Sequence, residues 1–149
     1  MNYSIIKLEG LSMKPFLKTA DMVVVKKIEE SDRVLLGSCI YQNNLVHRLV
    51  KNQSLKGDRI LYYDQVPFNE NSSFLVIGRI LSHSPELKVS HHQHFLLRQI
   101  SRLISIFSIF NREQNPLRLV IIALIIASSN AHRFLEYFII YPKNIEIQK

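Results

Sequence analysis

The stretch VLLGSCIYQNNLVHRLV, residues 34–50, decides the fold of this chain. It holds two apolar runs, each long enough for a strand, on either side of Gln42 and Asn43. A polar pair between two such runs favours an antiparallel hairpin with a tight turn. The sequence therefore predicts two neighbouring strands, the second of which carries His47.

Short apolar runs of the same kind lie on both sides of this hairpin. The segment 22–27 is rich in valine and predicts a buried strand. Residues 69–73 are polar and predict a loop. We therefore expect residues 1–85 to form a mostly antiparallel β domain, with strands at 3–8, 22–27, 34–41, 44–50, 54–56, 60–63 and 74–81.

The pattern changes to helical spacing after Pro85. Apolar residues in 95–110 recur at helical intervals, with Arg98 and Arg102 between them. A break at 111–116 ends in Pro116, a residue suited to the first turn of a second helix. The second helix is expected over 117–141, so residues 86–149 form a helical tail and the fold class is α+β.

The tail is expected to fold as a helical hairpin, packed on the β domain or lying on a membrane surface. The apolar core of its second helix, residues 119–127, is far shorter than the about 20 residues that span a bilayer. Four arginines, at 98, 102, 118 and 133, are available to meet lipid headgroups. Residues 1–8 lack the basic start and long apolar core of a signal peptide, so we expect no N-terminal anchor. The expected location is the cytoplasm or a membrane periphery.

Composition limits the other classes of function. The 149 residues carry a formal net charge of +7, but the basic residues are scattered and form no long cluster. Neither a helix-turn-helix pattern nor zinc-finger spacing is present, so we expect no specific binding of nucleic acid. Cys39 is the single cysteine and lies in an apolar run, which predicts a small core residue.

Four residues supply the groups needed for nucleophilic catalysis. Ser12 lies in the segment Gly10-Leu11-Ser12-Met13-Lys14-Pro15. A nucleophilic serine needs a base within hydrogen-bond reach and usually a third group that orients the base. His47 is the candidate base, and Asp58 and Asp64 are the candidate acids.

The order of these motifs resembles the peptidase superfamily of signal peptidase I and the LexA-type self-cleaving repressors. The resemblance covers roughly residues 4–81. The two early Gly-Asp pairs of that family have lost their glycine here, to Ala20 and Ser31. A turn that needs φ > 0 is less stable without its glycine. The matching segments, in the order of the family, are Gly10 to Pro15, Ala20-Asp21 before 22–25, Ser31-Asp32 before 34–36, Val46-His47-Arg48, Lys56-Gly57-Asp58 and 76–80.

His47 places the resemblance closest to the Ser-His branch, which contains the endoplasmic-reticulum and archaeal signal peptidases. The resemblance implies that Asp64 orients His47 and that Asp58 is a second acid or a turn-former. A histidine titrates near neutrality and can take the serine proton without a large shift of its pKa. Lys51, four residues beyond His47, remains an alternative base.

The implied function is a serine endopeptidase that cleaves a peptide or precursor protein lying along a strand edge. The backbone N–H of Ser12 is the candidate oxyanion donor, because Gly10 stands where leader peptidases often have a hydroxyl. We expect Ser12 Oγ to lie near hydrogen-bond distance of a His47 ring nitrogen. Two alternatives stay open: an inactive peptide-binding member of the fold, and a membrane-surface protein that acts through its tail.

The segment His91-His92-Gln93-His94 also suggests a metal site. It lacks the separated second pair of ligands that zinc sites usually show. We therefore expect a polar linker there, and no metal or cofactor.

Overall fold

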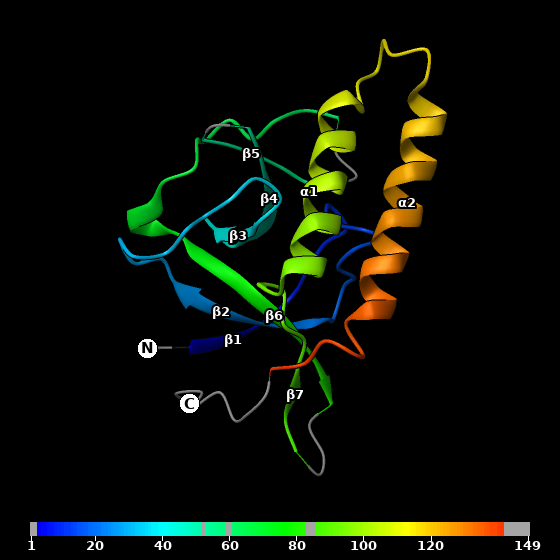
Figure 1. Ribbon diagram of the computed structural model, residues 1–149. Coiled ribbons are helices and arrows are strands. Elements are labelled where there is room, and N and C mark those ends of the chain that lie inside the picture. The colour runs from blue at the N-terminus through cyan, green and yellow to red at the C-terminus, as the bar shows by residue number, and fades with distance from the viewer. Residues whose placement is uncertain (1–2, 52, 59–60, 83–85, 142–149) are drawn as a thin grey trace.

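The structure is a computed structural model that describes residues 3–51, 53–58, 61–82 and 86–141. A curled antiparallel sheet is followed by two helices, which confirms the expected α+β class (Figure 1). The elements are β1 (Tyr3–Lys7), β2 (Met22–Lys27), β3 (Cys39–Gln42), β4 (Leu45–Lys51), β5 (Ser54–Lys56), the 3₁₀ turn η1 (Glu70–Ser72), β6 (Phe74–Ser82), β7 (Lys88–Val89), α1 (Phe95–Phe110) and α2 (Arg118–Leu135).

The strands follow the order β1-β2-β6-β3-β4-β5, and β7 pairs with β6. The sheet therefore extends beyond residue 85, into the segment that the sequence assigns to the tail. In Figure 1 the helices α1 and α2 lie side by side against the sheet. One core cluster joins the helices to the residues after β1 and includes Met13, Leu17, Val46, Ile104 and Ile125. A second cluster includes Val24, Ile40, Leu49, Leu55 and Leu75.

The β3–β4 hairpin forms as the sequence predicts, but its turn lies one residue later. Gln42 pairs directly with Leu45, so Asn43 and Asn44 make the turn. Their φ angles of 51° and 62° are both positive, which a two-residue type I′ turn requires and which asparagine tolerates. The strand β3 is also shorter than expected because residues 34–38 turn around Gly37.

Gly37 and Ala20 show what positive φ does in this chain. Gly37 has a φ of 91°, and a Cβ there would lie 2.7 Å from the backbone N of Arg102. Only glycine therefore allows this turn to pack against α1. Ala20 has a φ of 71°, a left-handed conformation that costs a residue other than glycine about 1–3 kcal/mol of backbone strain. Ser31 has no positive φ, so its turn does not need glycine.

Two sequence expectations about elements are wrong in part. Residues 61–63 form no strand, and residue 60 lies outside the described residues. The helix α2 ends at Leu135 rather than at 141, because residues 136–139 turn and bring Ile140 into a bridge with Ser90. By contrast, β2, β5 and α1 have the predicted bounds.

Buried side chains bind the helices to the sheet. Lys56 Nζ donates to the carbonyl oxygens of Ser108 at 2.5 Å and Asn111 at 3.1 Å, which satisfies the C-terminal end of α1. Burial, followed by the charge of Arg112, lowers the pKa of Lys56 to about 8. Ser105 Oγ donates to the carbonyl of Leu49 at 3.2 Å. The helical segment thus shares one core with the β strands.

Candidate active site

His47 and Asp64 are brought together by β4 and the loop that follows β5. Asp64 is positioned by its backbone N–H, which donates to the carbonyl of Leu55 at 2.9 Å. His47 Nδ1 lies 2.5 Å from Asp64 Oδ2. The His47 residue is 3 % exposed, and its Nε2 is buried with no hydrogen-bond partner in the described part of the chain. If Nδ1 carries the proton, the carboxylate fixes the tautomer in which Nε2 is free to accept one.

Ser12 lies in a turn between β1 and β2 and is half-buried. It lines a groove of 310 Å³ that also contains Gly10, Tyr41 and Val46. The groove is therefore formed by the end of β1, the serine turn and the β3–β4 hairpin. The Ser12 hydroxyl does not reach His47, because His47 Nε2 has no hydrogen-bond partner among the described residues.

The alternation of side chains along β4 explains this separation. Val46 belongs to the core cluster of Met13 and Leu17, on the side of the serine turn. Successive side chains of a strand point to opposite faces. His47 therefore points to the other face, where its direct cross-strand partner Ile40 belongs to the second core cluster. The expected hydrogen bond between Ser12 and His47 is absent from this structure.

Asp58 has a different partner from the one that a catalytic role would require. Its two carboxylate oxygens accept from Arg48 Nε and Nη2, both at 2.7 Å, and both side chains are fully buried. The Arg48 guanidinium also lies 4.4 Å from the centre of the Phe16 ring. Of the two expected roles, second acid or turn-former, the structure shows Asp58 in a turn, where it is the counterion of a buried arginine and not a partner of His47.

The two remaining residues of the sequence analysis differ in their surroundings. Lys51 is exposed at the end of β4, so it lacks the burial that a neutral lysine base requires. Cys39 is a buried core residue, as predicted, and burial raises the pKa of its thiol to about 12. A thiol in this environment is a poor nucleophile.

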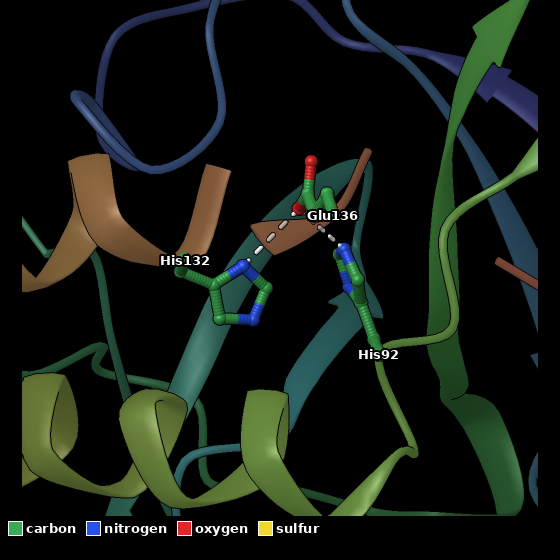
Figure 2. Close-up of side chains that lie close together, drawn as sticks. All are labelled: His92, His132 and Glu136. Carbon is green, nitrogen blue, oxygen red and sulfur yellow. Dashed lines mark hydrogen bonds and ion pairs between the residues drawn. The ribbon is translucent and has the colours of Figure 1, made fainter. Parts of the chain in front are cut away.

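A second polar cluster lies behind α1, and the sequence analysis missed it. His92, His132 and Glu136 converge in Figure 2, and all three are buried. His92 is thus not part of a polar linker, although the neighbouring His94 is exposed and accepts from the backbone N–H of Leu96 at the start of α1. The sequence signal was the spacing of His132 and Glu136, which are one helical turn apart.

The chain matches no family model, no curated protein and no solved structure. Its function is therefore inferred from its own residues. The site thus consists of a His47–Asp64 pair with a buried Nε2 and, on the other side of β4, a groove lined by Ser12.

Proposed function

We propose that this protein is a serine endopeptidase with a signal-peptidase-like fold, which cleaves peptide bonds through Ser12, His47 and Asp64. The observation that carries the proposal is the 2.5 Å contact of His47 Nδ1 with Asp64, which leaves Nε2 unpartnered among the described residues. In this mechanism Ser12 Oγ attacks the carbonyl while His47 Nε2 takes the hydroxyl proton. His47 then gives that proton to the leaving amine as the C–N bond breaks, and Asp64 stabilises the imidazolium. Water, deprotonated by His47, then cleaves the acyl ester on Ser12 and releases the acid.

An open strand edge supports binding of a peptide substrate. The strand β5 pairs with β4 only from Arg48 onward, so Leu45–His47 has no strand partner on that edge within the described residues. The backbone N–H of Leu49 donates to the carbonyl of Ser38, on the β3 side of β4. Because backbone groups of successive residues in a strand point to alternate edges, those of Val46 point to the open edge. An extended peptide can add to such an edge. Val46 also lines the groove of Ser12, so the peptide would pass beside the nucleophile.

The mechanism requires the serine turn to pass around the open edge of β4 when substrate binds, and the buried Nε2 of His47 to become accessible. Gly10, with a φ of 93°, has open space around it, but Met13, directly after Ser12, is buried in the core, so this movement would break core contacts. The separation of Ser12 and His47 equally favours a second function, a peptide-binding protein without turnover. The two functions differ in one observable, namely hydrolysis.

Peptide hydrolysis by the full chain tests this proposal. A library of quenched fluorescent peptides is incubated with wild-type protein, Ser12→Ala and Ser31→Ala. We expect cleavage by the wild type and by Ser31→Ala, and a loss of at least about 10³-fold in Ser12→Ala. Saturable peptide binding without cleavage, equal in all three proteins, would establish the non-catalytic function instead.

The outer face of α1 and α2 favours a second function, attachment to a membrane surface. In α1 and α2 large apolar side chains remain exposed where neither helix nor sheet covers them. Apolar patches of this kind on a protein surface mark interaction sites. They include Leu103, Ile106, Phe110, Leu119, Val120 and Phe134.

The basic side chains beside this face favour an anionic lipid surface as its binding partner. Neither α1 nor α2 contains an aspartate or glutamate, whereas Arg98, Arg102 and Arg118 lie on or at the start of these helices. Basic residues beside an apolar face are typical of helices at anionic interfaces. Arg133 does not contribute, because it donates to Asp21 at 2.8 Å.

The helix α2 is long and apolar enough to span a membrane by length and composition alone, with a mean hydropathy of 1.4. The sequence analysis predicts that this helix is too short to span a bilayer, but that prediction rests on residues 119–127 alone, whereas the helix comprises Arg118–Leu135. However, Ile121, Ile125 and His132 of α2 are buried within the fold. Insertion across a bilayer would remove them from this core, so attachment to the surface is the state we propose.

Vesicle flotation measures this attachment. We expect the full chain to float with vesicles that contain anionic lipid and to sediment with neutral vesicles or in high salt. The double variant Leu119→Ser/Phe134→Ser should bind at least about tenfold more weakly, because burial of each such side chain contributes about 1–2 kcal/mol. Ile5→Ser/Val66→Ser is the matched control, since these exposed apolar residues lie outside the helices. Equal loss in both variants would contradict a helix-specific surface.

A further inference from the structure

Three groups of the kind that bind metals converge between the sheet and the end of α2. His92 Nε2 lies 2.8 Å from Glu136 Oε1, and His132 Nδ1 lies 3.2 Å from the same oxygen. Figure 2 shows both imidazole rings directed at the carboxylate. The ligand atoms of all three residues lie within 4.8 Å of one another. They come from the segment before α1 and from the C-terminal end of α2.

His132 is fully buried, and among the described residues its ring is only partly satisfied. Its Nδ1 has the 3.2 Å contact with Glu136 Oε1, which lacks hydrogen-bond geometry, and its Nε2 has no hydrogen-bond partner. A buried polar group without a partner is destabilising and rare in folded proteins.

Glu136 supplies the negative charge of the cluster. Burial alone would raise its pKa, but the contacts with His132 and His92 and the charge of Arg79 together hold that pKa well below its usual range. The carboxylate is therefore ionised at neutral pH. Its Oε1 faces the two imidazoles, while Oε2 accepts from Arg79 Nε at 2.7 Å.

We propose that His92, His132 and Glu136 form a buried binding site for a divalent transition metal, with Zn²⁺ as the ion that fits best. Two imidazole nitrogens and one carboxylate oxygen are a typical donor set for zinc. Tetrahedral bonds of about 2.0–2.1 Å hold ligand atoms about 3.3 Å apart. The separations of 2.8 and 3.2 Å from Glu136 Oε1 need only a small expansion to admit the ion, and the two imidazole nitrogens lie within 4.8 Å of each other.

Arg79 has two opposing effects on this site. As a hydrogen-bond donor to Oε2, it fixes the orientation of the ligating carboxylate, as outer partners of metal ligands commonly do. Its positive charge also repels a cation, and Asp21, 3.9 Å from the guanidinium, offsets part of that charge. We expect the remaining charge of Arg79 to weaken binding of the ion but not to prevent it.

The ion would connect α2 to the sheet independently of the proposed peptidase site. His92 follows β7, and its side chain also lines a cavity of 270 Å³ with Gln93 and Cys39. In the proposed site this cavity would be the route for the ion, and water would be the fourth ligand. Binding to the folded state alone would stabilise the fold.

Metal content and thermal stability of the purified full chain test the proposal. The protein is stripped with EDTA, incubated with Zn²⁺ and passed through a desalting column. We expect one Zn²⁺ per wild-type chain and a rise in Tm of at least about 3 °C with Zn²⁺ in excess. His132→Gln and His92→Gln should bind none. His91→Gln and His94→Gln are matched controls from the same segment and should bind as the wild type does.

A wild-type chain that retains no Zn²⁺ and shows no change of Tm overturns the proposal. Retention that depends on His91 or His94 as strongly as on His92 does the same, because it indicates a surface site. If the variants of His92 and His132 fail to fold, the visible absorption spectrum of Co²⁺ bound to the wild-type chain tests the site instead. Strong visible absorption typical of tetrahedral Co²⁺ supports the site, and weak octahedral absorption contradicts it.

Discussion

Replacement of Asp58 by asparagine is expected to lower the free energy of unfolding by about 3–5 kcal/mol. Arg48 is fully buried and keeps its charge in every folded state, so it needs the Asp58 carboxylate as a counterion. The guanidinium also donates to the carbonyl of Gly37 at 2.9 Å and to Ser101 Oγ at 2.6 Å. Loss of the counterion therefore weakens the junction of β4, the turn before β3 and α1. Urea unfolding measures the change.

Asp64→Asn is the matched control for stability. The Asp64 side chain is 22 % exposed and makes one hydrogen bond, to His47, so we expect a loss of only about 1 kcal/mol. Replacement of both members of the buried pair, Arg48→Met with Asp58→Leu, should restore much of the stability lost in Asp58→Asn. Equal destabilisation by Asp58→Asn and Asp64→Asn would contradict the assignment of Asp58 to Arg48.

The largest effect on activity is expected at His47. His47→Ala should reduce peptide cleavage by about 10⁴-fold or more, because the proposed mechanism transfers the Ser12 proton to His47 Nε2. Asp64→Asn should reduce cleavage by about 10³–10⁴-fold, since the amide no longer holds the tautomer with a free Nε2. Lys51→Ala should leave cleavage almost unchanged, because Lys51 is exposed.

Steady-state kinetics with one cleaved peptide measure these three variants, after circular dichroism has shown that each is folded. Loss of cleavage in Lys51→Ala with activity retained in His47→Ala would indicate a lysine base. If Asp58→Asn loses more cleavage activity than its smaller fraction of folded protein explains, Asp58 would be a catalytic acid.

Local patterns in the sequence were sufficient to predict most secondary structure. The valines of β2 and the helical spacing of α1 are properties of neighbouring residues, and both elements have their predicted bounds. The β3–β4 turn was placed one residue early because both Gln42-Asn43 and Asn43-Asn44 suit a turn. Only the register of the strands, set by long-range pairing, distinguishes the two.

The partners of charged groups were harder to predict because they depend on packing between distant segments. Motif order indicated a pair of His47 with Asp64, and the structure brings them together. It could not indicate that Arg48 takes both oxygens of Asp58, nor that β4 separates the serine turn from the face of His47. His92 and His132 are 40 residues apart in the chain, so their convergence follows only from the docking of α2.

Covalent labelling of Ser12 tests the central proposal most directly. The full chain, bound to anionic vesicles, is treated with a fluorophosphonate that reacts with activated serines, and the modified residue is mapped by mass spectrometry. We predict one adduct on Ser12 in the wild type and in Lys51→Ala, and no adduct in His47→Ala or Asp64→Asn. An adduct on Ser12 that persists in His47→Ala, or its absence from the wild type, would contradict a Ser12–His47–Asp64 peptidase.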